Sequence, residues 1–334
     1  MSFGVGTFQH GGEDPFPGLV SGDRVSDLRE IFGPTATILS LLGEWERALP
    51  QLVEVAQGRG EYQLGELSVL APITPPGPFL CAGANYRMHI IEMRTANAVA
   101  QGLDGEIAKA QATAAMDERA ANGIPFIFAG WPGAVIGAND EVIIPADSGQ
   151  RHDWELELAV VIGRHARYIS EAEAMDYVAG YTILNDISTR DRMHRTDLRF
   201  TDFMATKMRA TFKPIGPWIV PRQFVEDPHN LRITLKLNGA TMQDDTTGDM
   251  IFKIPRLIEY ASTLTDLRPG DMIATGSPSG NAQHHGGRWL GPGDLIESEI
   301  EGLGVQRNHC VAASLQPKGP DFGSAFTKPA LAEA

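Results

Sequence analysis

The chain has 334 residues, long enough for one large domain, or one domain with a smaller appendage, around a substantial core. Its 42 acidic residues against 28 basic residues give a net charge of -14, which argues against nucleic acid and membrane surfaces as partners. No apolar run approaches the length of a membrane span and no secretory pattern opens the chain, so we expect a cytoplasmic protein.

The N-terminal region, residues 1–75, is expected to form a small subdomain and its linker. Residues 1–24 are rich in Gly, Asp and Pro and predict an extended lead-in, whereas residues 25–56 carry apolar side chains at the spacing of short helices. The proline-rich segment 72–78 cannot continue a helix, so it marks the preferred domain boundary.

The main domain is expected at residues 76–316, followed by a flexible tail at 317–334. Residues 79–83 predict its first strand, and His89 and Glu92 follow at a spacing of three. On a helical turn the two side chains would share a face, and a carboxylate beside an imidazole makes it a better base. A simple surface ion pair fits the same spacing.

A helical insertion is predicted at residues 94–123, which are rich in Ala, Glu, Gln and Arg. Its place between the His89–Glu92 turn and the next strand would suit a lid over a site. A solvated helix pair without a catalytic role fits the same composition. Short strands separated by Gly and Pro turns are expected next, at 126–128, 134–136 and 141–144.

An acidic strand gives the strongest chemical signal. Because side chains alternate along a strand, Asp153, Glu155 and Glu157 share one face. Carboxylates about 7 Å apart repel by roughly 2 kcal/mol at an effective dielectric of about 20, so a cation is expected among them. Asp186, at the end of the next predicted strand, would add a third oxygen ligand for Mg²⁺, or else Mn²⁺ or Ca²⁺. The alternative is a solvated strand face.

The C-terminal half offers further polar candidates. Lys207 precedes a strand and would present a cation to an anionic substrate, although a lone lysine is usually a surface residue. The small-residue loop 275–280 offers N–H and hydroxyl donors to an anion, but many such loops bind nothing. His284 and His285 lie in a Gly-rich segment, and we interpret them as loop residues rather than ligands.

The remaining elements complete a β-rich α+β pattern. Asn238-Gly239 predicts a hairpin, and the apolar spacing of residues 250–263 predicts a helix that packs on the core. Further strands are expected at 272–274, 295–300 and 305–312.

Several of these stretches together resemble the catalytic domain of the fumarylacetoacetate hydrolase family. Each motif is modest, but their order over roughly residues 79 to 312 is specific to that family. The matching stretches are Gly83-Ala84-Asn85-Tyr86 with His89 and Glu92, Asp153-Trp154-Glu155-Leu156-Glu157-Leu158, Asn185-Asp186-Ile187-Ser188-Thr189-Arg190-Asp191, Lys207 with Phe212, Gly216-Pro217-Trp218, Pro269-Gly270-Asp271 and Thr275-Gly276-Ser277-Pro278-Ser279-Gly280. The resemblance implies a mixed β-sandwich roll that assembles as a homodimer.

The resemblance also implies the roles of particular residues. It implies a divalent cation, Mg²⁺ before Mn²⁺ or Ca²⁺, that chelates a 2-oxo acid or a β-diketone. The implied metal ligands are Glu155, Glu157 and Asp186. The implied catalytic residues are His89 and Glu92, which activate water, and Lys207, which supports the developing enolate.

Substrate contacts are expected from Tyr86, Arg190, Met193 and Ser277. Relatives often carry a glutamine where this chain has Met193, and the chain also departs from the family's pattern around Trp131 and at Met208. Because these changes surround the substrate rather than the metal, they favour a less polar and bulkier substrate.

The sequence therefore predicts a metal-dependent hydrolase that cleaves a carbon–carbon bond of an acylpyruvate or β-diketone acid, in the catabolism of aromatic ring-cleavage products. Decarboxylation, isomerisation or hydration of a related 2-oxo acid is the alternative, because one enolate-stabilising site serves all of these reactions. A catalytically silent protein that binds a metal or ligand is the alternative from another class. The expected partner is the small-molecule substrate.

Overall fold

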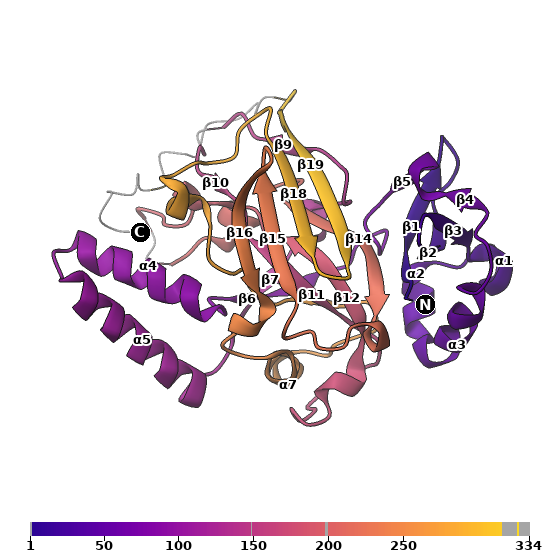
Figure 1. Ribbon diagram of the computed structural model, residues 1–334, viewed down its shortest axis with the longest axis horizontal. Coiled ribbons are helices and arrows are strands. Elements are labelled where there is room, and N and C mark those ends of the chain that lie inside the picture. Colours follow the sequence, from indigo (N-terminus) through magenta and orange to yellow (C-terminus); the bar gives the residue numbers. More distant parts are fainter. Residues whose placement is uncertain (1, 148, 198–199, 316–325, 327–334) are drawn as a thin grey trace.

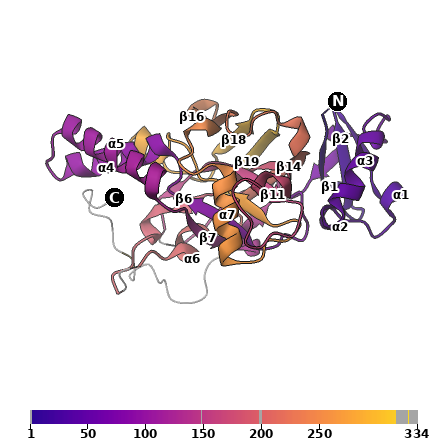
Figure 2. The ribbon, with the colours of Figure 1, turned by 90° about the horizontal axis from the view of Figure 1, so that it is seen from below.

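The computed structural model describes residues 2–147, 149–197, 200–315 and 326. An N-terminal unit, a central pair of sheets and a helical hairpin follow one another along the longest axis (Figure 1). Figure 2 shows the same order from below, with helix α7 facing the viewer in the middle of the central part. The predicted tail, 317–334, lies outside the described residues except for Phe326.

The N-terminal unit combines a small sheet with three short helices. Its strands are β1 (Gly4–His10), β2 (Phe16–Ser21), β3 (Arg24–Asp27), β4 (Tyr62–Gln63) and β5 (Leu67–Val69). Its helices are α1 (Arg29–Phe32), α2 (Ile38–Gly43) and α3 (Trp45–Val55), which confirms the prediction of short helices in this region.

The predicted extended lead-in at residues 1–24 is wrong, because β1 and β2 form an antiparallel pair there. Two of the glycines that suggested a loop, Gly4 and Gly18, are packing positions within these strands. A Cβ atom on Gly4 would lie 2.2 Å from Trp218, and one on Gly18 would lie 2.5 Å from Phe8. Glycine therefore lets aromatic rings pack against the strand backbone.

The N-terminal strands continue into one large sheet in the order β4-β3-β2-β1-β14-β12-β11-β17-β6-β7, with β5 beside β1 and β8 beside β14. The central members are β6 (Phe79–Gly83), β7 (Phe126–Gly130), β8 (Val135–Ile136), β11 (Leu156–Ile162), β12 (Val178–Asn185), β14 (Lys213–Pro221) and β17 (Met272–Ala274). Every residue of β11 and β12 is buried, as their apolar runs predict. The boundary expected after residue 75 stays a prediction.

A second sheet packs against the first in the order β16-β15-β18-β19-β9. Its strands are β9 (Val142–Ile144), β15 (Arg232–Leu237), β16 (Ala240–Thr246), β18 (Leu295–Ile300) and β19 (Gly304–Ala312). The hairpin predicted at Asn238-Gly239 is confirmed, and both residues have positive φ, at 52° and 81°. A short pair, β10 (His152–Asp153) with β13 (Ser188–Thr189), lies beside the sheets.

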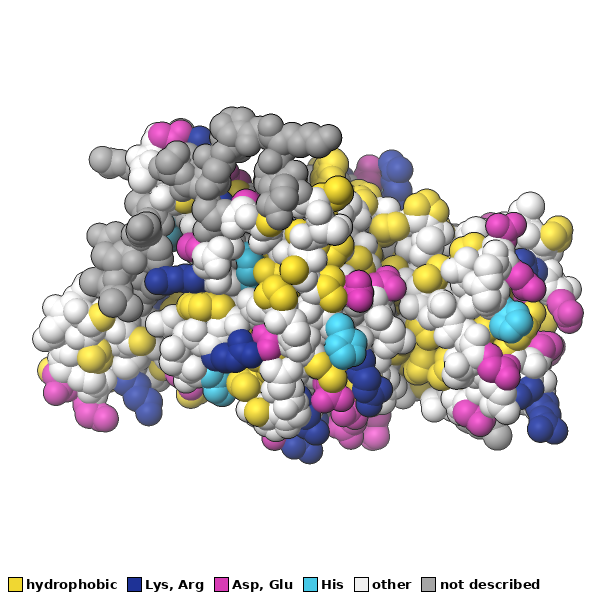
Figure 3. Space-filling view, turned by 90° about the horizontal axis from the view of Figure 1, so that it is seen from above, with side chains coloured by type: hydrophobic (Ala, Val, Ile, Leu, Met, Phe, Trp, Pro, Cys, Tyr) yellow, Lys and Arg dark blue, Asp and Glu magenta, His cyan; other side chains and the backbone are white. Residues whose placement is uncertain are grey.

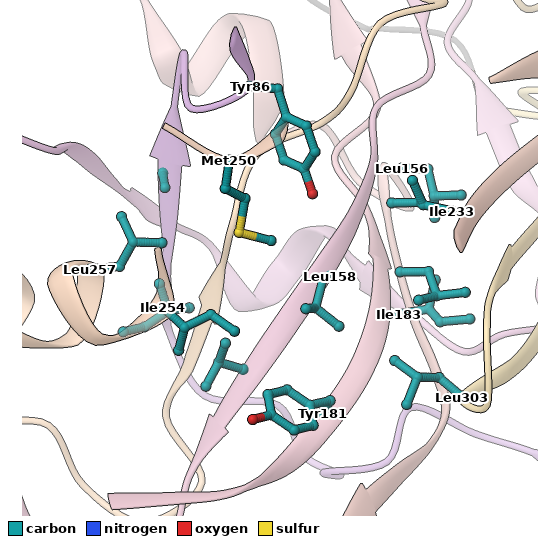
Figure 4. Close-up of a cluster of buried hydrophobic side chains, with 14 of the residues drawn as sticks. Tyr86, Leu156, Leu158, Tyr181, Ile183, Ile233, Met250, Ile254, Leu257 and Leu303 are labelled. Atoms are coloured by element: carbon teal, nitrogen blue, oxygen red, sulfur yellow. The ribbon is translucent and has the colours of Figure 1, made fainter. Parts of the chain in front are cut away.

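The main core fills the space between the sheets and helix α7 (Ile254–Leu264). Figure 4 shows Leu158 of β11 among Tyr181 of β12, Met250 and the α7 side chains Ile254 and Leu257. Strands dominate and helices sit at the margins, so the predicted β-rich α+β class is confirmed.

The insertion is a helix pair, α4 (Arg87–Ala100) and α5 (Gly105–Asn122), and α4 begins before the expected start at residue 94. Its base is fixed to the sheets, since the backbone N–H of Met88 donates to Asp249 at 2.7 Å. The pair projects from the central part on the side opposite the N-terminal unit (Figure 1).

The surface agrees with the composition. On the face in Figure 3, basic side chains stand singly or in small groups among acidic and uncharged ones. Within the described ranges, no helix is both long enough and apolar enough to cross a bilayer.

Candidate metal and substrate site

The antiparallel pairing of β11 and β12 brings the three expected metal ligands together. Leu156 lies opposite Asn185, so Glu155 and Asp186 become neighbours, and the Asp186 N–H donates to the Glu155 carbonyl at 2.8 Å. Glu155, Glu157 and Asp186 are all buried and offer carboxylate oxygens within 4.8 Å of one another. The grouping expected from strand alternation is present, and ion binding by it stays a prediction.

Two cationic side chains lie against this cluster. The Nζ atom of Lys207, at the end of α6 (Phe203–Lys207), contacts carboxylate oxygens of Glu155 and Asp186. Arg190 bridges Asp153 and Glu155, with N···O distances of 2.9 and 2.7 Å. Lys207 is therefore a buried member of the site rather than a surface lysine, with 8% of its surface exposed.

Lys213 is a third cation, and sequence analysis gave it no role. Its fully buried Nζ lies 2.7 Å from Oδ1 of Asp186 and donates to the carbonyls of Ile187 and Phe212, at 3.0 and 3.1 Å. A lysine at the start of a buried apolar strand needs an internal partner, and this was the available signal.

The charge balance of the cluster suits a divalent cation. Four carboxylates, those of Asp153, Glu155, Glu157 and Asp186, face three cations, so one negative charge is left when all are ionised. Burial and then the charge of Asp186 raise the pKa of Glu157 well above its usual range. Burial acts in the same direction on Glu155, but Arg190 and Lys207 hold its pKa well below the usual range.

The ligand atoms also fit such an ion. Among the residues that the structure describes, Asp186 Oδ1 accepts no hydrogen bond, although Nζ of Lys213 lies 2.7 Å from it as an ion-pair partner. A buried carboxylate oxygen without a hydrogen bond can coordinate a cation, and an all-oxygen set is preferred by Mg²⁺, Mn²⁺ and Ca²⁺.

His89 lies on the first turn of α4. Besides burial, charged groups of the same cluster, Glu155, Arg190 and Lys207, influence its pKa. Burial lowers its pKa to about 4, and the charge of Glu155 opposes that shift. The imidazole is therefore neutral near pH 7. Its Nδ1 atom is buried without a hydrogen-bond partner in the described part of the chain.

Glu92 lies one turn further along α4. It was expected to pair with His89, but it contacts Ser279 and His284 instead. Its Oε2 atom accepts a hydrogen bond from the Ser279 hydroxyl and lies 2.9 Å from Nε2 of His284. The ring centres of His284 and His89 are 6.1 Å apart. Sequence analysis missed His284 and Ser279, because no local pattern shows that the loop after β17 reaches α4.

The loop 275–280 is fixed by Gln243 of β16. The side-chain amide of Gln243 donates to Ser277 Oγ and the Pro278 carbonyl, both at 3.0 Å. The Gly276 N–H, expected to meet an anionic substrate, donates instead to Glu157 at 2.8 Å. The loop therefore orients a carboxylate of the cluster.

The four expected substrate contacts occupy different environments. Arg190 belongs to the carboxylate cluster, Ser277 is buried against Gln243, and Met193 is half-buried after the turn that follows β13. Tyr86 has no exposed surface and stands beside Met250 and Leu158 in the core (Figure 4). Its hydroxyl is buried and has no hydrogen-bond partner among the described residues, and contact between Tyr86 and a substrate stays a prediction.

The comparisons with known proteins agree with this architecture. The family model described as "Fumarylacetoacetate (FAA) hydrolase C-terminal" matches residues 79–311. The mitochondrial oxaloacetate tautomerase FAHD2A of Bos taurus is 37% identical over 248 residues, which cover 74% of this chain and 70% of the relative. Its counterpart in Rattus norvegicus is 33% identical over 309 residues, 90% of this chain and 88% of the relative.

Solved structures extend the likeness to the whole fold. The maleylpyruvate hydrolase from Sphingobium sp. SYK-6, in complex with manganese(II) ion and pyruvate, is 26% identical with a TM-score of 0.71, covering 94% of this chain and 100% of that one. The fumarylacetoacetate hydrolase from Exiguobacterium antarcticum is 26% identical with a TM-score of 0.72, covering 93% and 100%. The predicted β-rich roll is therefore confirmed, and this chain belongs to the fumarylacetoacetate hydrolase family.

Proposed function

We propose that this protein is a divalent-metal-dependent enzyme that enolises a 2-oxo acid, and that its reaction is the keto–enol tautomerisation of a small dicarboxylic 2-oxo acid such as oxaloacetate. The observation that carries the proposal is the buried carboxylate cluster with the Lys207 ammonium and the neutral His89 imidazole beside it. The relatives named as oxaloacetate tautomerases support the choice of substrate.

Each part of the site has a role in this reaction. Glu155, Glu157 and Asp186 would hold the ion. When bound, a divalent cation supplies a Lewis acid that draws electron density from the 2-oxo group. Lys207 then stabilises the negative charge that develops on the enolate oxygen. His89, neutral near pH 7, accepts the proton from the carbon next to the carbonyl.

Tautomerisation takes precedence over the carbon–carbon hydrolysis expected from the sequence. Both reactions begin at the enolate, but hydrolysis also needs a base that activates water beside the distal carbonyl. Glu92, the expected helper of that base, is engaged with Ser279 and His284. Acylpyruvate or β-diketone hydrolysis is the second candidate, supported by the likeness to maleylpyruvate hydrolase.

Product analysis distinguishes the candidates. Metal-replete protein would be given oxaloacetate, enriched in its enol, and separately a panel of acylpyruvates, with products followed by NMR. Faster enol–keto equilibration without new products supports the tautomerase, while pyruvate and a carboxylic acid from an acylpyruvate support the hydrolase. Release of CO₂ would indicate a decarboxylase and a product one water heavier a hydratase, and bound metal without any turnover would favour a silent binding protein.

We also propose that the protein is a homodimer, as the resemblance implied. In the described sheet β7 is a terminal strand, and Phe126 on it is 46% exposed, so a second copy would have an open edge and an aromatic side chain to cover. Light scattering tests this assembly. The cytoplasmic location stays a prediction, because the tautomerase relatives are mitochondrial, and cell fractionation tests it.

A further inference from the structure

Helix α4 and the loop after β17 meet through charged and polar side chains at the edge of the proposed site. Glu92 receives the Ser279 hydroxyl and lies 2.9 Å from Nε2 of His284. The side chains of His284 and Glu92 are 28% and 39% exposed, so both reach solvent. The pair of His284 and Glu92 is therefore accessible to solvent, and the His284 ring also lies near His89.

The imidazole rings of His89 and His284 lie close to each other. Their ring centres are 6.1 Å apart, with the planes tilted by 53°. No hydrogen bond joins the two rings in the described structure, so a proton that moves between them would need an intervening water. Nδ1 of His89 is buried and has no partner among the described residues, so it has a free site for such a water or for substrate.

Glu92 serves His284 rather than His89. After the dominant effect of burial, the largest influences on the pKa of His89 are the charges of Glu155, Arg190, His284 and Lys207. Within the described chain, the carboxylate that pairs with the His284 ring is that of Glu92. His89, which is half-buried with its Nδ1 atom enclosed, thus lies next to a separate imidazole–carboxylate pair that faces solvent.

We infer that His284 and Glu92 form an outer proton relay that exchanges the proton taken up by His89 with solvent; this inference rests on the proposed function. His284 acts through His89 and is a positioning residue, which does not touch the reacting atoms. The relay explains how a proton on the enclosed Nδ1 of His89 can reach solvent during each turnover.

The proton balance of the relay is closed. The C–H bond next to the carbonyl breaks, its electron pair forms the carbon–carbon double bond, and the carbonyl π pair moves to oxygen. The proton passes from His89 through the bridging water to one nitrogen of His284, while the other nitrogen releases a proton to Glu92 and then to solvent. A proton from solvent reaches the enolate oxygen, so the enol forms with no net gain or loss of protons.

The neighbouring His285 supplies a matched control. It lies on the same loop and is exposed, but its Nε2 atom is 2.9 Å from the backbone carbonyl of Met242 rather than from Glu92. His284→Gln and His285→Gln therefore make the same chemical change at adjacent positions, and only the first interrupts the relay. Glu92→Gln tests the second member.

The experiment measures the exchange of pyruvate methyl hydrogens in D₂O by NMR, together with kcat and KM for oxaloacetate tautomerisation, using full-length metal-replete protein. We expect His284→Gln to lower kcat and the exchange rate at least about tenfold with KM changed less than about twofold, since a relay acts on proton transfer. Glu92→Gln should act in the same direction. Added imidazole should restore the His284→Gln rate, and His285→Gln should match the wild type.

Three outcomes would overturn the relay. A His284→Gln variant with wild-type exchange shows that the pair carries no proton. A variant whose rate falls with a raised KM and no rescue by imidazole shows a purely structural contact between loop and helix. A wild type that accelerates neither exchange nor tautomerisation with any of the three ions overturns the proposed function itself, and the relay with it.

Discussion

Lys213 holds its ammonium group 2.7 Å from Oδ1 of Asp186, and both side chains are completely enclosed by the protein. The same ammonium group donates to the backbone carbonyls of Ile187 and Phe212. Lys213 thus ties the start of β14 to the segment that carries a proposed metal ligand. Fold stability and site geometry depend on one ion pair.

Replacing Lys213 with methionine should therefore destabilise the fold. The change leaves the buried carboxylate of Asp186 without one of its cations, and losing one partner of a buried pair costs about 3–5 kcal/mol. Urea unfolding in the presence of chelator measures the effect. Lys236→Met, on the exposed face of β15, is the control and should change the stability by less than about 0.5 kcal/mol. Equal effects of the two substitutions would contradict the assigned role.

Loss of a cluster carboxylate should weaken metal binding. Glu157→Gln keeps the size of the side chain but removes the charge that the ion would neutralise, so we expect Mn²⁺ affinity to fall by at least about tenfold. Calorimetric titration of chelator-treated protein measures this. Glu297→Gln on β18, outside the cluster, should bind like the wild type. Unchanged affinity in Glu157→Gln would place the ion elsewhere.

Acid should destabilise the protein through its buried histidines. Burial, helped by the charge of Arg209, lowers the pKa of His152 to about 4, against about 6.5 in an unfolded chain. Between pH 4 and pH 6.5, His152 binds a proton in the unfolded chain but not in the folded chain. Stability is therefore retained above about pH 6.5 and falls by up to about 1.4 kcal/mol per pH unit for this group as the pH drops towards 4.

The variant His152→Gln isolates that contribution. Its free energy of unfolding should depend less steeply on pH between 6.5 and 4 than that of the wild type, whatever its stability at neutral pH. Denaturant unfolding at several pH values, each with chelator, gives the two slopes. His309→Gln, at an exposed position of β19, should keep the wild-type slope. Identical slopes for wild type and His152→Gln would rule out this assignment.

The loop after β17 should tolerate little change at Gly276. This glycine has φ of 94°, and a Cβ atom there would lie 3.1 Å from the Cβ of Asn85. Gly276→Ala combines a left-handed backbone with a tight contact, so we expect a loss of about 1–3 kcal/mol in thermal or urea unfolding. Gly239→Ala has the positive φ without the contact, and it should cost less. A neutral Gly276→Ala would show that the loop adapts freely.

Local sequence patterns were sufficient to predict much of the fold and part of the site. Alternation along 153–158 and the apolar run before Asp186 brought Glu155, Glu157 and Asp186 together correctly, although the predicted strand is interrupted at residues 154–155, between β10 and β11. The hairpin at Asn238-Gly239 follows from turn chemistry alone.

Residues 1–24 show where local pattern failed. Their glycines serve close packing by Phe8 and Trp218, which depends on strands brought together by the fold. The partners of Glu92 and the buried position of Lys213 were missed for the same reason, because their contacts join segments far apart in the sequence. Composition around Glu92 carries no sign of its contacts, whereas the place of Lys213 at the start of an apolar strand was a signal.

The most direct test of the proposed enolisation is the rate of oxaloacetate keto–enol exchange with chelator-treated protein before and after addition of Mg²⁺, Mn²⁺ or Ca²⁺. We predict little acceleration before addition, a strong acceleration with at least one of the ions, and no such acceleration in Glu155→Gln. Acceleration that persists in chelator and in Glu155→Gln, or none with any of the ions, would contradict it.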